Sequence, residues 1–130
     1  MTTNSQSKAP LLNGQSSYSM NNPTVNVSDF TTFPGPRYKK LGSCSGEEFR
    51  DNILIPSIQK YGRDLIVNLD GVMGYGSSFL EETFGGAIRS GIDPSVVLKV
   101  AENVICNDEP ELKKEILSYV KDQMEKLKSE

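Results

Sequence analysis

A glycine-rich loop followed by two serines is the part of this 130-residue sequence best suited to chemistry. The stretch Asn68–Glu82 has the sequence NLDGVMGYGSSFLEE, in which an apolar run leads into spaced glycines and then into Ser77 and Ser78 at a predicted helix start. Backbone N–H groups at a helix N-terminus attract anions, so the position suits a phosphate ligand. A serine at this position also suits phosphorylation, which would add negative charge to a docking surface.

A purely structural role accounts for the same residues, and both interpretations stay open on the sequence alone. Serine is a preferred N-cap residue, glycines allow a tight turn out of a strand, and Ser78 with Glu81 has the spacing of a capping box. The loop lacks the G-x-x-x-x-G-K-[ST] phosphate loop, the third glycine of the dinucleotide fingerprint and the hydrolase elbow G-x-S-x-G.

Acidic side chains flank the loop and raise the question of metal binding or acid–base catalysis. Asp70 precedes the first glycine of the loop, and Glu81 and Glu82 follow the serines. Adjacent residues on an α-helix point about 100° apart, so we do not expect the two glutamates to form one site. We expect Glu81 to take part in capping and Glu82 to face solvent.

Basic residues gather upstream of the loop. Arg37, Lys39 and Lys40 lie in one segment rich in proline and glycine, and Arg50 follows further on. We expect these side chains to be solvated surface, the alternative being contact with an acidic partner or a phosphate.

The composition argues against several classes of function. Histidine is absent, which removes His-based catalytic triads and most zinc and iron sites. The two cysteines, Cys44 and Cys106, form no Cys-x-x-Cys pair, and we expect both to be reduced thiols. A net charge of −3 argues against nucleic-acid binding, and no apolar stretch suggests a membrane span. We therefore expect a cytoplasmic, non-enzymatic protein without a metal or cofactor.

The hydrophobic pattern predicts which elements position the loop. Residues 1–23 are polar and lack periodicity, which predicts a disordered tail before a domain at 24–130. Alternating apolar residues predict a strand from Thr24 to Phe30, and compact apolar runs predict strands at 64–69 and 104–106. Helical spacing predicts helices starting near 45, 78, 94 and 110. This order predicts an α/β domain with helices packed on a small mixed sheet of about four strands.

Two predicted helices contain residues that disturb a regular helix. Pro56 should kink or split the helix that begins with the capping box Ser45–Glu48. Gly85 and Gly86 each cost about 1 kcal/mol relative to alanine inside a helix. We expect this glycine pair to let the helix pack closely on the sheet, the alternative being contact with another chain.

These motifs resemble the STAS-like domain family of unknown function. The resemblance rests on Leu69–Val72, Gly74–Glu82 and Phe84–Gly86, and upstream on Pro34–Tyr38 and Ser45–Arg50. It covers roughly Thr24 to Tyr119. The wider relatives are the STAS domains, which are named for sulphate transporters and the bacterial anti-sigma factor antagonists.

The resemblance implies a STAS-like fold and a non-enzymatic regulatory module that acts through protein contacts. In the antagonists an ATPase-fold kinase phosphorylates a serine in Asp-Ser-Ser-Gly-Leu and thereby switches binding. The matching serine here is Ser77, followed by Ser78, while Gly76 replaces the aspartate and Phe79 the glycine. The partner would contact Asp70, Gly71, Gly74, Tyr75, Gly76, Phe79 and Glu82. The alternative function is a small-ligand, nucleotide or anion-binding domain that uses the glycine-rich loop.

Overall fold

The computed structural model describes residues 22–129. The predicted tail therefore lies outside the described residues except for Asn22 and Pro23, and its disorder stays a prediction. The Pro23 carbonyl accepts a hydrogen bond from the Ile66 amide (2.8 Å), and the Asn22 side-chain amide donates to the Asp64 carbonyl (3.1 Å). The chain thus pairs with the sheet from Pro23 onward.

A small parallel sheet forms the base of the domain. Strands β2 (Thr24–Asn26) and β3 (Ile66–Asn68) pair in parallel, with Val25 opposite Val67. The prediction of about four strands is wrong for the described residues, which contain these two strands. The predicted strand at 104–106 contributes a single parallel bridge between Asn68 and Ile105, because the chain turns away after Cys106.

The first predicted strand is shorter than expected. It ends at Asn26, and the short helix α1 (Val27–Phe30) follows directly. The alternation of apolar residues suggested extended backbone, but a helical turn delivers the same side chains to the core. Val27 is buried, and the Phe30 ring lies 5.3 Å from the Phe49 ring between centroids.

The helix predicted from Ser45 forms and runs through Pro56 without a break. It consists of α2 (Gly46–Phe49), a π-helical turn at Arg50–Leu54 and α3 (Ile55–Tyr61). The predicted capping residue is confirmed, since the Glu48 amide donates to Ser45 Oγ at 3.0 Å. The Glu48 carboxylate accepts from the Cys44 amide at 3.2 Å instead of from the Ser45 amide. The wide turn directly precedes Pro56, where a regular helix would meet the proline ring.

The helix after the glycine-rich loop is also interrupted by a π-helical turn. It comprises α4 (Ser77–Leu80), the turn Glu81–Gly85 and α5 (Gly86–Arg89). Gly91 ends it as predicted, with a φ of 103° and its amide bonded to the Ile88 carbonyl at 3.0 Å. The Ile92 amide bonds to the Ala87 carbonyl at 3.1 Å, which completes a Schellman motif.

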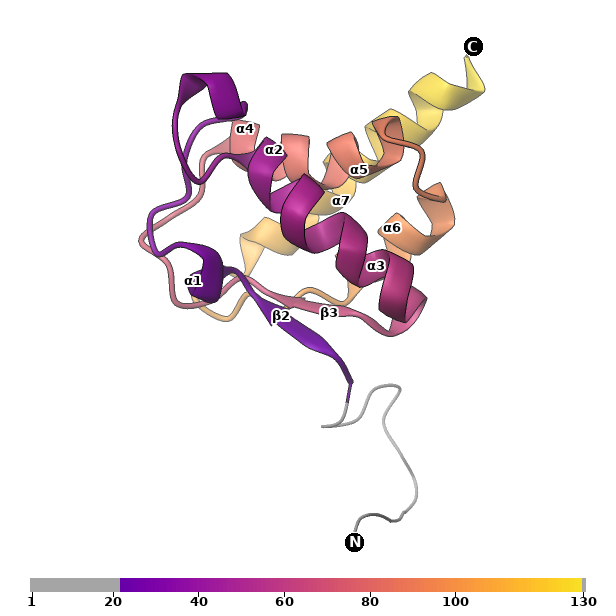
Figure 1. Cartoon of the computed structure of the whole chain (residues 1–130). Helices are drawn as coiled ribbons and strands as arrows, with labels where there is room; N and C mark the ends of the chain where they lie inside the picture. Colours follow the sequence, from indigo (N-terminus) through magenta and orange to yellow (C-terminus); the bar gives the residue numbers. More distant parts are fainter. Residues whose placement is uncertain (1–21, 130) are drawn as a thin grey trace, which may run out of the picture.

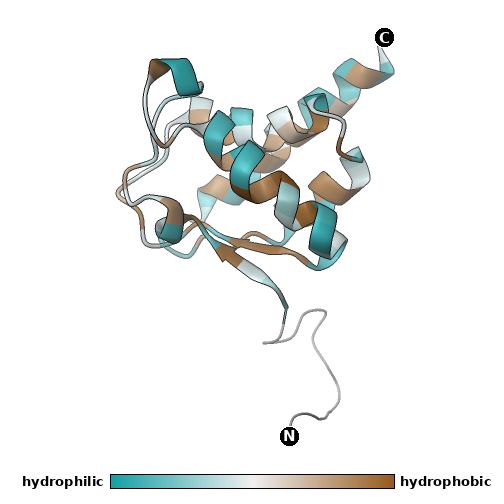
Figure 2. Cartoon of the chain, viewed as in Figure 1, coloured by the Kyte–Doolittle hydropathy of each residue, from teal (hydrophilic) through white to brown (hydrophobic). Residues whose placement is uncertain are grey.

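Two further helices complete the domain, α6 (Pro94–Glu102) and α7 (Glu111–Lys128). Asp93 caps α6 as predicted, because its carboxylate accepts from the Ser95 amide at 2.9 Å. In Figure 1 the strands lie below the helices, and the C-terminal end of α7 projects beyond the rest of the chain. Figure 2 shows β3 as mainly hydrophobic, consistent with the burial of Leu65, Ile66 and Val67.

Candidate functional site

The glycine-rich loop leaves β3 at its carboxyl end and is held in place by Asp70. One Asp70 carboxylate oxygen accepts from the Asp108 amide at 2.9 Å, and the other from the Asn107 side chain at 3.1 Å. The Asp108 carboxylate in turn accepts from the Gly71 amide at 3.0 Å. These reciprocal bonds clamp the loop to the turn after Ile105, so Asp70 has a clear structural role.

Tyr75 fastens the other half of the loop. Its hydroxyl donates to the Leu69 carbonyl at 2.7 Å, and its ring lies 5.9 Å from the ring of Phe79 between centroids. Burial raises the pKa of Tyr75 far above its usual value, and the nearby carboxylates of Asp70 and Glu109 raise it further. The phenol is therefore a neutral hydrogen-bond donor that closes the loop.

Ser77 and Ser78 are exposed at the first two positions of α4. The predicted capping box of Ser78 with Glu81 is wrong, because Gly76 is the N-cap residue and no side chain caps this end. The Ser77 hydroxyl lies near the Tyr119 hydroxyl of α7. Burial and the 2.5 Å hydrogen bond to Glu115 raise the pKa of Tyr119, and a hydrogen bond with Ser77 opposes that shift.

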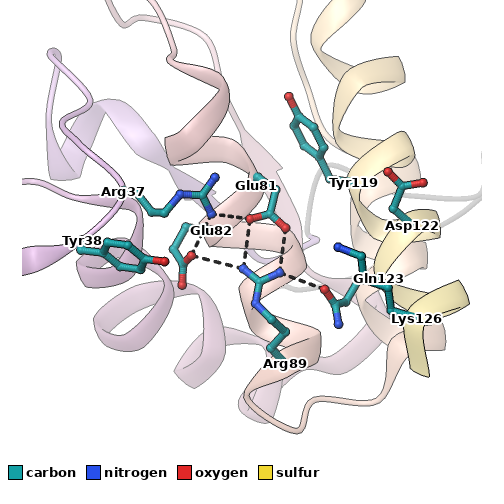
Figure 3. Close-up of a pocket in the computed structure, with 9 residues that line it drawn as sticks. All are labelled: Arg37, Tyr38, Glu81, Glu82, Arg89, Tyr119, Asp122, Gln123 and Lys126. Carbon is teal, nitrogen blue, oxygen red and sulfur yellow. Dashed lines mark hydrogen bonds and ion pairs between the residues drawn. The ribbon is translucent and has the colours of Figure 1, made fainter. Parts of the chain in front are cut away.

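Three arginines converge on Glu82, which the sequence analysis expected to face solvent. That expectation is wrong, since only 8% of the Glu82 side chain is exposed. One of its oxygens accepts from Arg37 Nη1 (3.0 Å) and Arg89 Nη2 (3.2 Å), and the other accepts from Arg50 Nη1. Figure 3 shows Arg37 and Arg89 reaching this carboxylate from different elements.

Glu81 is held by two of the same arginines. Its carboxylate accepts from Arg37 Nη1 at 2.5 Å and from Arg89 at 2.7 and 3.0 Å. Hydrogen bonds from Arg89, and then from Arg37, lower the pKa of Glu81 to about 2 against the opposing effect of burial. Glu81 is therefore an anion at any physiological pH.

The two adjacent glutamates thus form one cluster, contrary to the prediction from α-helical geometry. They begin the π-helical turn Glu81–Gly85, in which more residues per turn mean a smaller rotation between neighbours. The long guanidinium side chains also span both carboxylates. The expectation that Arg37 and Arg50 are simply solvated is wrong for the same reason, whereas Lys40 is exposed and lies over the Tyr38 ring.

Gly85 and Gly86 make room for this cluster. A Cβ atom at Gly85 would lie 2.5 Å from the Glu81 carboxylate, and one at Gly86 would lie 2.8 Å from Arg50 Nη1. The expectation that these glycines allow close packing on the sheet is therefore wrong, because their near neighbours are charged side-chain atoms. The close helix contact falls at Gly46, where a Cβ would meet the Phe79 carbonyl oxygen at 2.6 Å.

A cleft opens over the cluster. We call it the arginine cleft; it has a volume of about 490 Å³ and lies between the Arg37 segment, the α4–α5 helix and α7 (Figure 3). Its lining is polar and charged: Arg37, Tyr38, Glu81, Glu82, Arg89, Tyr119, Asp122, Gln123 and Lys126. In the sequence, the indication of this cleft was the presence of the arginines. Their spacing along the chain did not predict that they would pair with the glutamates.

The predicted site residues differ in their exposure to solvent. Phe79 and Glu82 are buried, whereas Gly71, Gly76, Ser77 and Ser78 are exposed. Gly74 and Tyr75 lie between these extremes.

Two exposed apolar residues beside the loop were missed by the sequence analysis. The Phe33 side chain is 67% exposed and Met73 is 75% exposed. Their loops are joined by a 2.8 Å hydrogen bond from the Met73 amide to the Thr32 carbonyl. The sequence did contain a signal for these two residues. Each is a large apolar residue in a turn-rich segment, outside the predicted helices and strands whose packing would bury it.

The described residues contain neither a cluster of metal-ligating side chains nor a membrane-spanning helix. Within 22–129 no three His, Cys, Asp or Glu side chains are grouped so as to hold a metal ion. Over the same range no helix has the length and apolar character needed to cross a membrane.

The comparison with protein families confirms the resemblance found in the sequence. Residues 45–103 match the family described as a STAS-like domain of unknown function. The match includes the α2–α3 helix, β3, the glycine-rich loop and the α4–α5 helix, and it is shorter than the range expected from the motifs. No curated protein and no solved structure matches the chain significantly. The matched segment is thus similar to a STAS-like domain, and the family description does not fix its function.

Proposed function

We propose that this protein is a non-enzymatic interaction module that binds another protein through the face around the glycine-rich loop. The observation that carries the proposal is the exposure of Phe33 and Met73 on two loops that are hydrogen-bonded together. We call this the contact face and define it as Phe33, Met73, Gly74, Gly76, Ser77 and Ser78. Large apolar side chains clustered on a surface are typical of protein-binding sites.

The contact face is supported by a rigid base. Asp70 and Tyr75 fix both ends of the loop, and the Met73 amide bonds to Thr32. A preorganised loop loses little conformational entropy on binding, which favours affinity.

The charges around the loop favour a partner with a basic surface. Asp70, Asp108 and Glu109 lie close enough to Tyr75 to raise its pKa, and Asp29 is exposed on α1, where Ser28 lies against Gly71. Like charges repel at short range, so the same carboxylates disfavour an anionic ligand at this loop. They therefore weigh against the alternative function, an anion held by the glycine-rich loop.

Phosphorylation of Ser77 or Ser78 would regulate such an interaction. Both hydroxyls are exposed at the edge of the contact face, and a phosphate adds roughly 1.5 to 2 negative charges at neutral pH. On a surface that already carries carboxylates, this charge would add to the attraction for a basic partner and strengthen binding. Ser77→Asp should then strengthen binding and Ser77→Ala should leave it unchanged, with both variants folded.

The test is quantitative co-purification from the native host with tagged wild type and the double variant Phe33→Ser/Met73→Ser. We expect a stoichiometric protein with wild type that the double variant loses at least tenfold. The matched control is Tyr61→Ser, because Tyr61 is also exposed but ends α3, away from the contact face. Equal recovery with the wild type and the double variant would refute the proposed face. A partner of the ATPase-fold kinase class would further support the switching mechanism.

A further inference from the structure

The arginine cleft contains hydrogen-bond donors that the protein does not satisfy. Arg37 uses only Nη1 in its bonds to Glu81 and Glu82. Among residues 22–129, none accepts a hydrogen bond from Arg37 Nε or Nη2. Figure 3 shows the second amino group of Arg37 directed away from the two glutamates, on the side of Tyr119. This Nε–Nη2 edge is the part of a guanidinium that binds an oxyanion through two parallel hydrogen bonds.

The orientation of this edge is fixed in advance. The bonds of Nη1 to both carboxylates hold the guanidinium plane, and the two carboxylates are themselves held by Arg89. The Arg37 side chain is only 28% exposed. A ligand would therefore meet a donor pair that is already positioned, so that little side-chain entropy is lost on binding.

Two further donors line the same cleft. The Tyr38 hydroxyl points toward the cleft in Figure 3, and the Lys126 ammonium extends from α7. Neither group has a hydrogen-bond or ion-pair partner among the residues that the structure describes. The opposing group is Asp122, a lining carboxylate without a described partner one turn before Lys126. Glu81 and Glu82 are occupied by arginines. The cleft groups without a described partner are thus mainly hydrogen-bond donors. The one negative charge among them, on Asp122, disfavours large polyanions.

We propose that the arginine cleft binds a small molecule carrying one carboxylate or phosphate group, with the oxyanion on the Nε–Nη2 edge of Arg37. The cleft volume of about 490 Å³ is larger than the volume of a lone ion and falls within the range of volumes of small-molecule binding sites. Tyr38 and Lys126 donate further hydrogen bonds to the oxyanion or to polar groups next to it. This site shares no residue with the contact face, so its failure would leave the proposed function unaffected.

The test is an NMR titration of the full chain with three separate probes: inorganic phosphate, phenyl phosphate and acetate. The Arg37 Nε–Hε signal, assigned by its loss in Arg37→Lys, should shift and saturate with phosphate or with acetate, and the stronger of the two identifies the oxyanion. Phenyl phosphate should bind about threefold or more tightly than inorganic phosphate, because an aromatic group adds contact with the tyrosine side chains.

The variants separate a built site from general charge attraction. Arg37→Lys keeps the charge but lacks the paired donors, and should weaken phosphate or acetate binding at least about tenfold. Lys126→Gln should weaken it about two- to fivefold, as expected for a partly solvated charge. The matched control is Lys128→Gln, an exposed lysine of α7 that does not line the cleft. Shifts that do not saturate, or equal weakening by Lys128→Gln, would mean an adventitious ion only and would overturn the proposal.

Discussion

The substitution Glu82→Gln is the most stringent test of whether the ion pairs between Glu82 and its three arginines stabilise the fold. The substitution keeps the side-chain volume but removes the negative charge that three guanidinium groups share. One of the two amide positions becomes an N–H donor that faces an arginine donor. Removing one partner from a buried ion pair costs about 3–5 kcal/mol.

The exposure of the arginines decides where in that range the effect falls. Arg50 is only 12% exposed and keeps only its bond to Asp51 in a nearly dry site, whereas Arg37 and Arg89 are 28% and 36% exposed and regain some solvation. We therefore expect a loss of about 3 kcal/mol in the free energy of unfolding. For a domain of this size, that loss corresponds to a decrease in Tm of roughly 12 °C or more.

Urea unfolding followed by circular dichroism measures this loss. The matched control is Glu102→Gln, an exposed glutamate of α6, which should change the free energy of unfolding by less than about 0.5 kcal/mol. A double-mutant cycle of Glu82→Gln with Arg50→Gln should show coupling above about 1 kcal/mol. A Glu82→Gln effect as small as that of the control, or an additive cycle, would refute the account of the cluster.

Three further predictions concern the elements that carry the site. Gly46→Ala should destabilise the domain by about 1–3 kcal/mol, because its Cβ would press on a backbone carbonyl of α4, whereas Gly76→Ala, with open space around it, should be nearly neutral in the same urea assay. Ser45→Ala should cost about 1 kcal/mol by loss of the helix cap, and Ser78→Ala, which removes no cap, should stay within about 0.5 kcal/mol; equal costs would contradict the assigned caps. The folded-state pKa of Glu81 is lowered from 4.5 to about 2, so its contribution to stability is fully present above pH 4.5 and is lost as the pH falls toward 2. Glu81→Gln should flatten the fall in stability between pH 5 and 2 relative to wild type, and an unchanged pH profile would contradict the pairing.

The local signals in the sequence were reliable where short-range physics decides the structure. Ser45, Asp93 and Gly91 mark helix ends, as predicted from side-chain capping and from the backbone freedom of glycine. The glycine-rich loop also follows a buried strand and precedes a helix, as expected. These features depend on residues within about four positions of each other.

The charged cluster could not be predicted in this way. Arg37 meets Glu81 across 44 positions and Arg50 meets Glu82 across 32 positions, and no spacing rule connects such residues. The π-helical turn that brings Glu81 and Glu82 together is also invisible to an analysis based on 3.6-residue periodicity. The helix-interior glycines were the available clue, because their unfavourable propensity requires a compensating reason.

The number of strands was overestimated because apolar runs predict burial better than they predict pairing. Val104 and Cys106 are buried as expected, yet only one bridge at Ile105 joins this segment to β3. Short apolar segments can fill a core without forming a ladder, and periodicity does not distinguish the two cases.

Hydrogen exchange on the complex with the co-purified partner tests the central claim most directly. If the contact face binds the partner, amides at 31–33 and 71–78 become protected in the complex, while the amides of the exposed residues 63–64 after α3 exchange as in the free protein. Protection confined to α6 or to the end of α7, with unchanged exchange at 31–33 and 71–78, would contradict the claim that the glycine-rich loop and its two exposed apolar neighbours form the binding face.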